Sequence, residues 1–598
     1  MRTRTDTITA EIIRHGLVAI TDEMKTNLMR TAYNMVIYEA LDYTVGLFDA
    51  DGNTISIGLG LPMFIRGLSD TVKAKLAHFG RDGIRPGDVL LTNDAYITGS
   101  HLNHLVFTLP IYCDDRLVAF ASTMAHWQDV GGTIAGITTD IYQEGLQLPI
   151  LKVYEEGRLD QKIVDIIRAN VRLPDLAMGD FRAQIAAIQT GERRMRQLLR
   201  RNGRQAVEDS IAQMMRHSEA EAREAVAAIP DGVYEAESFM DDDGVRLGVP
   251  IKLRVRVVVE GNQMTVDLSG IDRQVAGYFN SGATAGRSAA EVAFKCLTSP
   301  TTMPINDGSF RPLKVVLPPG RLVSATKPAA MRCWMNPPQT IVDTIFKALA
   351  PAIPERVIAG HHADLLALVS FGVHPRTGRF YIGSGGLPGG GWGATHNQDG
   401  MNVVVCLNDG DTHNAPVEAT EAKLPLVFEK YELRQDSGGA GEYRGGLGCV
   451  QVRRVLNETT ISSQIDRTQC APWGLFGGRD GLPNKITLRR GGQEVEQANG
   501  KMSQVRLDGG DAYVLHSGGG GGFGDPLDRP VERVQQDVVR GYVSVESAAR
   551  DYGVVVDPTT LAVDARQTEE RRRALRQGRP AAATPPAGPP PAGSRPTS

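Results

Sequence analysis

Glycine restricts the possible folds of this chain more than any other residue type. The 598 residues include 66 glycines, and the densest runs, 383–393, 437–448 and 517–525, all follow residue 380. Glycine accepts positive φ and lets two backbones approach closely, so such runs suit tight turns or anion-binding nests. The ordinary interpretation is a set of connecting loops in a turn-rich β region.

None of these glycine runs completes a known phosphate-binding motif. A Walker A loop needs Gly-Lys-Ser or Gly-Lys-Thr, and no run is followed by those residues. No run follows a strand in a Rossmann βαβ unit with a suitably spaced acidic residue. We therefore expect the chain to have no nucleotide site of its own.

Length and composition indicate a multidomain globular protein. A chain of 598 residues is too long for a single core, so two to four domains are expected. The net charge of −4 with no basic block gives no support for nucleic-acid binding. No apolar run reaches 18 residues, so no membrane span is expected.

The cysteines and the N-terminus favour a cytoplasmic location. Residues 1–6 are polar (MRTRTD) and lack the apolar stretch of a secretory signal. The six cysteines are scattered without Cys-x2-Cys spacing, which is typical of reduced thiols and not of a disulfide or metal motif.

The pattern of apolar residues predicts a mixed α/β (α+β), multidomain fold with a β-rich C-terminal half. We expect an α/β region with long helices over 1–230, a mixed α/β region over 231–400, and a β-rich region ending in helices over 401–578. The Pro/Ala-rich residues 579–598 are expected to form a disordered tail.

Local patterns in the first region are clear enough to place its elements. They predict one or two helices over 8–38, a strand and turn over 42–52, a helix over 67–79, strands at 89–92, 106–112 and 117–123, and long helices over 160–202 and 204–228. His101 and His104 then fall in a loop between strands, and His126 falls just past a strand end.

These histidines form a cluster in the sequence. The chain has 12 histidines, and His101, His104 and His126 lie within 26 residues, spaced His-x2-His and then 21 residues to the third. Neutral imidazole is a common metal ligand, and a catalytic metal site keeps three protein ligands and one open position. The alternative is three ordinary polar loop histidines, because His-x2-His is not a closed zinc-finger signature.

Several motifs around the histidines resemble one known family. They are residues 87–94 (GDVLLTND), 99–104 (GSHLNH), 125–132 (AHWQDVGG), 141–145 (IYQEG), 169–172 (ANVR), 431–434 with 444–448, and 518–526. In this order, over about residues 8–565, the chain resembles the hydantoinase B/oxoprolinase family, which also contains the large subunits of ATP-dependent ketone carboxylases.

The resemblance implies a metal site. It implies that His101, His104 and His126 bind one divalent metal, with Asp42 as a fourth candidate ligand. The common family pattern His-Leu-Pro-Asp is His101-Leu-Asn-His104 here, so an imidazole replaces a carboxylate. This nitrogen-rich set favours Zn and still accepts Mn, Fe or Co. It is also compatible with the lactam-hydrolysing branch of the family.

The resemblance also implies a divided reaction. A hydantoinase A-type partner would bind ATP and phosphorylate the amide oxygen, in a heterotetramer of two A and two B subunits. This chain would then open the activated cyclic amide, a hydantoin, lactam or oxoproline, with metal-activated water as nucleophile. Asp94 or Asp129 would accept the proton. The alternative is that Asp94 only shapes its turn and Asp129 only orients a ligand imidazole.

Two other functions stay open. The same scaffold could serve as the large subunit of an ATP-dependent ketone carboxylase, or as a non-catalytic scaffold subunit. The intact set of His101, His104, His126 and Asp42 argues against the scaffold alternative.

Overall fold

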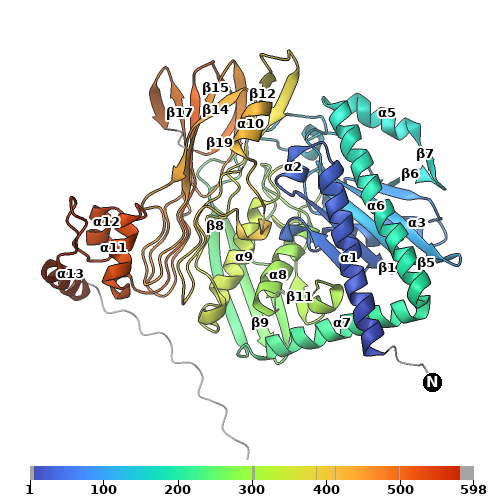
Figure 1. Cartoon of the computed structure of the whole chain (residues 1–598), viewed down its shortest axis with the longest axis horizontal. Helices are drawn as coiled ribbons and strands as arrows, with labels where there is room; N and C mark the ends of the chain where they lie inside the picture. The colour runs from blue at the N-terminus through green and yellow to red at the C-terminus, as the bar shows by residue number, and fades with distance from the viewer. Residues whose placement is uncertain (1–5, 299–303, 385–386, 411, 497–498, 579–598) are drawn as a thin grey trace, which may run out of the picture.

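The structure is a computed structural model that describes residues 6–298, 304–384, 387–410, 412–496 and 499–578. Helices and several multi-stranded sheets alternate along the chain, and the second half is β-rich (Figure 1), which confirms the predicted fold class. The predicted domain boundaries stay predictions. The predicted disordered tail lies outside the described residues.

The first region contains a seven-stranded antiparallel sheet with the order β2-β1-β5-β4-β3-β6-β7. Its strands are β1 (Tyr43–Asp49), β2 (Thr54–Leu59), β3 (Val89–Thr92), β4 (His104–Cys113), β5 (Arg116–His126), β6 (Leu151–Glu155) and β7 (Arg158–Leu159).

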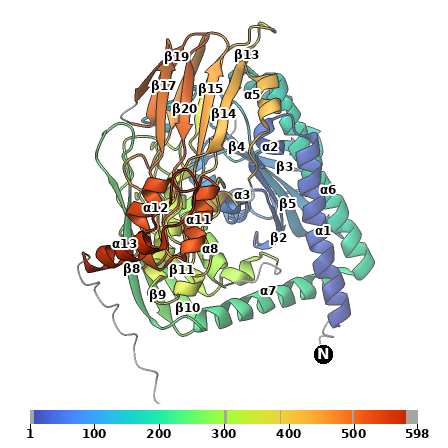
Figure 2. The same ribbon diagram turned by 60° about the vertical axis from the view of Figure 1, so that its left-hand side comes forward.

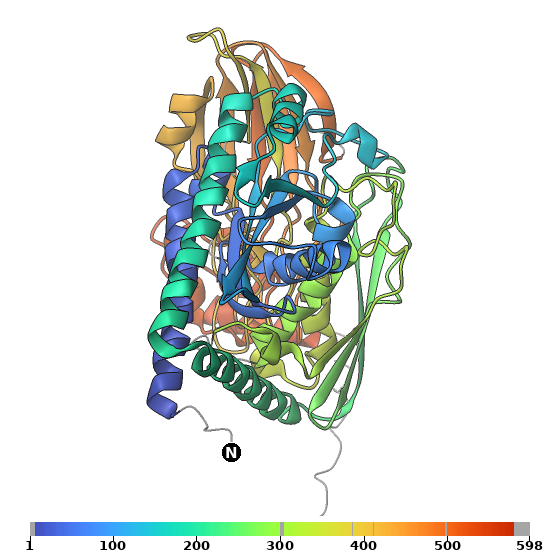
Figure 3. The same ribbon diagram turned by 90° about the vertical axis from the view of Figure 1, so that its right-hand side faces the viewer.

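Helices cover both faces of this sheet. Figures 1 and 3 show α1 (Thr7–Thr31) and α6 (Pro174–Asn202) side by side along one face. Buried residues of α1 recur at helical spacing, as the sequence predicted: Ile13, Leu17, Ile20, Met24 and Leu28. On the other face, α3 (Gly67–Phe79) packs over Val106 and Met124, with the bounds that the sequence predicted.

Two details of the first region differ from the sequence prediction. The long helix expected over 160–202 is split into α5 (Gln161–Asn170) and α6, because Pro174 disfavours helical backbone at the residue before it. His104 and His126 do not lie in loops: β4 begins at His104 and β5 ends at His126. The two residues are register partners, so the antiparallel pairing of β4 and β5 extends to His104 and His126.

Three further α-helices belong to the described part of this region, besides two short 3-10 helices, Pro62–Phe64 and Ile141–Gln143. They are α2 (Met35–Tyr38), α4 (Ala95–Thr98) and α7 (Arg204–Ala227), which runs toward the second sheet (Figure 3).

The middle region has a four-stranded sheet with the order β11-β10-β9-β8. Its elements are β8 (Gly232–Met240), β9 (Ile251–Glu260), β10 (Gln263–Asp267), β11 (Leu313–Val316), α8 (Ala283–Thr298) and α9 (Asn336–Leu349). Alternate residues of β9, such as Leu253, Val255 and Val257, are buried against these helices.

The second half of the chain forms two further sheets, β13-β12-β16-β19 and β14-β15-β20-β17-β18. Their strands are β12 (Leu368–Val373), β13 (Phe380–Gly383), β14 (Leu426–Leu433), β15 (Cys449–Val455), β16 (Thr459–Gln464), β17 (Lys485–Arg490), β18 (Gln493–Glu496), β19 (Lys501–Leu507) and β20 (Ala512–His516).

Four helices accompany these sheets. They are α10 (Val417–Lys423), α11 (Val531–Val539), α12 (Val545–Asp551) and α13 (Ala565–Gln577), and Figure 2 shows α11 to α13 grouped together. No helix in the described ranges is both long enough and apolar enough to cross a membrane.

The glycine runs are not simple connecting loops. Their described residues form long extended segments that pack against one another between the five-stranded sheet and α11 (Figure 1). A Cβ atom on Gly519 would lie 1.8 Å from the carbonyl oxygen of Ser437, and one on Gly520 would lie 1.9 Å from that of Trp392. A Cβ on Gly521 would lie 1.9 Å from the carbonyl oxygen of a third segment, at Trp473.

Successive glycines therefore face three different neighbours, and the pattern then repeats. Gly522, like Gly519, faces the segment 437–440, since its Cβ would meet the Ala440 carbonyl at 2.3 Å. Backbone hydrogen bonds join the segments, for example from Gly520 N to Gly446 O at 2.9 Å. A three-residue repeat is that of polyproline II helices, and only glycine leaves room for backbones on all sides.

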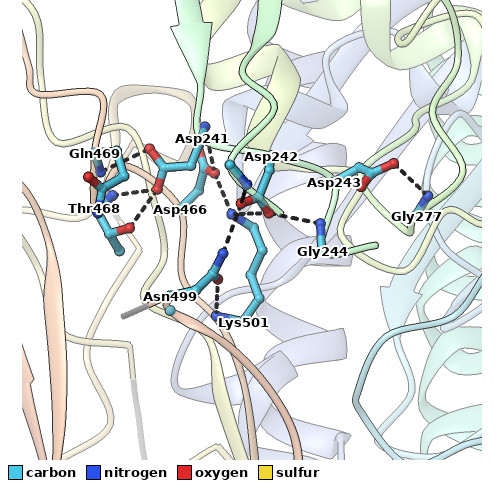
Figure 4. A network of polar contacts seen from close by, with 12 residues as sticks. Asp241, Asp242, Asp243, Gly244, Gly277, Asp466, Thr468, Gln469, Asn499 and Lys501 are labelled. Atoms are coloured by element: carbon cyan, nitrogen blue, oxygen red, sulfur yellow. Dashed lines mark hydrogen bonds and ion pairs between the residues drawn. The ribbon is translucent and has the colours of Figure 1, made fainter. Parts of the chain in front are cut away.

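A buried ionic network joins the middle region to the second half (Figure 4). The fully buried Lys501 Nζ lies 2.9 Å from Asp466 Oδ1 and 3.5 Å from Asp242 Oδ1. Asp241, the residue before Asp242, accepts hydrogen bonds from the backbone N–H groups of Gln469 at 3.0 Å and Cys470 at 2.9 Å. We call these residues the Lys501 junction.

Candidate functional site

Three adjacent strands bring the predicted ligands to one edge of the first sheet. His104 begins β4 and His126 ends β5, and the two are direct register partners. Asp42 immediately precedes β1, and its carbonyl oxygen accepts a hydrogen bond from His126 N at 3.1 Å. Directly opposed residues in an antiparallel pair project to the same face, so the His104 and His126 rings meet there.

His101 joins them from the turn between α4 and β4. Its ring centroid lies 4.5 Å from that of His104 and 4.9 Å from that of His126, and the His104 and His126 centroids are 5.3 Å apart. Imidazoles bound to one tetrahedral Zn ion have centroids about 5 Å apart, given the Zn–N distance of about 2.0–2.1 Å. The spacing of the three rings therefore fits a single metal ion.

The unpartnered nitrogens of the cluster also fit a metal. His101 Nε2, His104 Nδ1 and His126 Nδ1 are buried and have no hydrogen-bond partner. His101 Nδ1 donates to the carbonyl oxygen of Arg332 at 3.1 Å, which leaves Nε2 as the acceptor. As the side chains stand, however, no group of three or more His, Cys, Asp or Glu residues in the described ranges is placed so that it could hold a metal ion.

Asp42 is the fourth member of the cluster. Its Oδ1 lies 3.1 Å from His104 Nε2, a hydrogen-bond distance, and this contact leaves Nδ1 as the unpartnered nitrogen of the His104 ring. Burial opposes ionisation of Asp42, but the nearby His104 holds the pKa of the carboxyl below its ordinary value. A carboxylate is the protonation state that metal binding needs.

Burial favours the neutral state of His101 and His126. Burial lowers the pKa of His126 to about 4 and holds the pKa of His101 well below its ordinary value. Phe64 packs edge-on against His104 at 4.9 Å, and Trp334 lies 5.8 Å from the same ring, which limits access of water. Neutral imidazoles carry the lone pair that a metal ion requires.

The cluster opens into a cavity of about 420 Å³, which is in the range of small-molecule sites. All three predicted regions of the chain line it: His101 and His126 from the first, Arg332 from the middle, and Tyr381 and Gln464 from the second half. Most of the wall is apolar, including Ile134, Leu173, Val369, Phe380 and Leu387.

The two predicted proton acceptors lie in different surroundings. Asp94 does not line the cavity, and its carboxylate accepts from Tyr96 N at 3.0 Å as the N-cap of α4. Asp129 does line the cavity, but Arg172 Nη1 lies 2.8 Å from its Oδ1. Asp129 Oδ1 also accepts from Gly131 N at 3.2 Å, so these contacts hold the carboxylate in place and favour a positioning role for Asp129. Both catalytic roles stay predictions.

Two residues that line the cavity were not predicted as site residues from the sequence. Arg332 lines the cavity beside His101, and Glu144 accepts hydrogen bonds from the backbone N atoms of Met331 and Arg332, at 3.0 and 2.9 Å. Burial raises the pKa of Glu144. Arg332 is 231 residues from His101 in the chain, and no motif in the sequence marks it.

Comparisons with known proteins agree with this architecture. A family model described as hydantoinase B/oxoprolinase matches residues 6–526. The chain is 30% identical over 593 residues to a putative D-/L-hydantoinase subunit from Pseudomonas sp. (strain NS671), covering 95% of this chain and 98% of the relative. It is 30% identical over 569 residues to the beta subunit of the caprolactamase from Pseudomonas jessenii, covering 92% and 96%.

Two solved structures share the fold. The crystal structure of ATP-dependent caprolactamase from Pseudomonas jessenii superposes with a TM-score of 0.88 at 28% identity, covering 96% of this chain and all of that one. A nucleotide-free acetone carboxylase structure gives a TM-score of 0.89 at 19% identity, covering 96% of this chain and 84% of that one. The second similarity concerns the fold alone.

Proposed function

Because the chain belongs to the hydantoinase B/oxoprolinase family, we propose that it is the metal-dependent subunit of an ATP-dependent amidohydrolase that opens a cyclic amide. The substrate is a hydantoin, a lactam or an oxoproline. The observation that carries the proposal is the cluster of His101, His104, His126 and Asp42, of which Asp42, His101 and His126 line a small-molecule cavity.

The proposed metal is one divalent ion, with Zn favoured by the imidazole-rich ligand set and Mn, Fe or Co also accepted. His101, His104 and His126 would hold it, with Asp42 as the fourth ligand. When bound, such an ion supplies a Lewis acid that makes hydroxide available near neutral pH.

The chain's own residues prepare the site for hydrolysis. The Arg332 carbonyl oxygen fixes the His101 ring by accepting from Nδ1, so the opposite nitrogen faces the cluster. Asp129, held by Arg172, keeps the loop after β5 in place. The apolar cavity wall limits bulk water around the substrate.

An ATP-binding partner completes the proposal. The chain lacks a phosphate-cradling motif, and the names of two relatives describe them as subunits of an enzyme. We propose a hydantoinase A-type partner that phosphorylates the amide oxygen, in a complex of two A and two B subunits.

The test is to purify the chain with its A-type partner and to measure ATP hydrolysis with hydantoins, lactams and ketones. A cyclic amide should stimulate ATP use and yield a ring-opened product. His126→Ala should abolish ring opening, whereas His217→Ala, on the exposed side of α7, should leave it unchanged.

Two results would count against the proposal. Purified protein without stoichiometric Zn, Mn, Fe or Co would remove the metal. Substrate-stimulated ATP use that requires bicarbonate and gives a carboxylated product would select the ketone carboxylase alternative.

A further inference from the structure

The loop that carries Arg332 into the cavity is fixed at nearly every residue. Its hydrogen bonds are Ile141 N to Pro328 O at 2.9 Å, Tyr96 Oη to Ala329 O at 2.7 Å, Asn280 Nδ2 to Ala330 O at 3.0 Å, Met331 N and Arg332 N to Glu144 Oε1 at 3.0 and 2.9 Å, and Cys333 N to Tyr278 O at 2.9 Å. Donors and acceptors come from both the first and the middle regions, so the loop is rigidly placed.

The Arg332 side chain, unlike the backbone of its loop, has few polar contacts. Its Nε and Nη2 atoms are buried without a hydrogen-bond partner, and no carboxylate of the described residues lies within ion-pair distance. Glu144 attracts the guanidinium from further away, and Arg172 repels it. Arg332 nevertheless lines the same cavity as His101 and His126.

An unpaired buried guanidinium is costly. Arginine stays protonated in proteins, and an unpaired charge in a buried position is strongly destabilising. A rigid loop that places an unpaired guanidinium in the cavity wall is therefore suited to binding an anion. The planar guanidinium fork matches the geometry of carboxylate and phosphate oxygens, with two parallel N–H donors.

We propose that Arg332 binds an anionic oxygen group of the substrate beside the histidine cluster. This rests on the proposed function, in which two groups have that chemistry: the phosphoryl group placed on the amide oxygen by the partner, and a carboxylate carried by the substrate itself. Arg332 thereby orients the reacting carbon toward His101 and His126. The largely apolar wall leaves few other places for an anion.

Lys423 provides a matched control. It also lines the cavity, but its side chain is exposed and lies over the Tyr38 ring at 4.9 Å. A diffuse attraction between the cavity and anions would depend on both cations, whereas a built site depends on Arg332 alone.

The test is calorimetric titration of the full-length chain, treated with a chelator, with inorganic phosphate and separately with acetate. We expect saturable binding that weakens about 10- to 100-fold in Arg332→Gln, as for loss of charge-assisted hydrogen bonds. Arg332→Lys should weaken it less, and Lys423→Gln should retain it. Tighter binding of phosphate identifies the phosphoryl group as the natural anion, and binding of acetate that is as tight or tighter identifies a carboxylate.

Three results would overturn the proposal. They are absence of saturable binding of either anion by the folded wild-type chain, equal affinity in Arg332→Gln, and equal losses in Arg332→Gln and Lys423→Gln. The titration needs no partner, ATP or cyclic amide. Arg332-dependent anion binding together with an inactive complex would therefore refute the proposed function alone.

Discussion

Replacing Lys501 with methionine tests how strongly the Lys501 junction holds the chain together. Methionine keeps much of the side-chain volume but removes the cation that faces Asp466 at 2.9 Å and Asp242 at 3.5 Å. Asp466 is itself buried, and burial already raises its pKa. Removing one partner of a buried ion pair costs about 3–5 kcal/mol, since the other charge stays buried.

The expected readout is local hydrogen exchange. The backbone N–H groups of Gln469 and Cys470 donate to Asp241 in the same junction, so their protection should fall by about two to four orders of magnitude. The control is Lys252→Met: Lys252 lies 3.6 Å from Glu237, both side chains are about half exposed, and such pairs contribute about 0–1 kcal/mol.

A second variant separates charge from packing. Adding Asp466→Asn to Lys501→Met should recover part of the lost protection, because one uncompensated carboxylate is then neutral. If Lys501→Met changes exchange no more than Lys252→Met does, the junction does not hold the two regions together and the argument from buried charge is wrong.

Three further predictions concern single residues. Burial raises the pKa of Asp409 from 3.8 to about 8. The contribution of Asp409 to the free energy of unfolding is therefore most favourable below pH 3.8, and it is lost as the pH rises toward 8, because the unfolded chain ionises this carboxyl more readily than the folded protein does. In chelator-treated protein, Asp409→Asn should therefore raise the melting temperature at pH 7–8 and leave it nearly unchanged near pH 4; equal effects at both would contradict this. Gly520→Ala should prevent folding or sharply lower the melting temperature, because its Cβ would lie 1.9 Å from a carbonyl oxygen, whereas Gly578→Ala, whose Cβ would lie 3.6 Å from its nearest neighbour, should be tolerated. His104→Asp should keep the metal but shift elemental analysis from Zn toward Mn, and an unchanged metal ratio would show that this ligand does not set the preference.

The first region was predictable because its apolar residues recur at regular intervals. The helix over 67–79 and the strand at 89–92 were placed correctly from that periodicity. His104 was assigned to a loop and His126 to a position just past a strand end, because the predicted strands, 106–112 and 117–123, stopped short of both residues. Only the register of β4 against β5 shows that the ladder includes them.

The glycine segments could not be predicted in the same way. A residue without a side chain contributes nothing to hydrophobic periodicity, so a run such as 517–524 gives the same signal in a loop and in a packed bundle. What distinguishes the two is contact with other segments, at Ser437, Trp392 and Trp473, and these contacts connect distant parts of the sequence.

The site was only partly predictable for a related reason. The histidine cluster is local in sequence, so spacing and family motifs identified it. Arg332 belongs to the cavity through hydrogen bonds that span up to 231 residues, and no short motif encodes them.

The cavity and the Lys501 junction are physically connected. Gln464, which lines the cavity, ends β16 two residues before Asp466 of the junction, and its Oε1 accepts from Cys333 Sγ at 2.8 Å. Cys333 directly follows Arg332. A shift of Asp466 would therefore reach the Arg332 loop through one hydrogen bond. The Lys501 junction and the Arg332 loop are therefore linked through Gln464, which is two residues from Asp466 and hydrogen-bonded to the residue after Arg332.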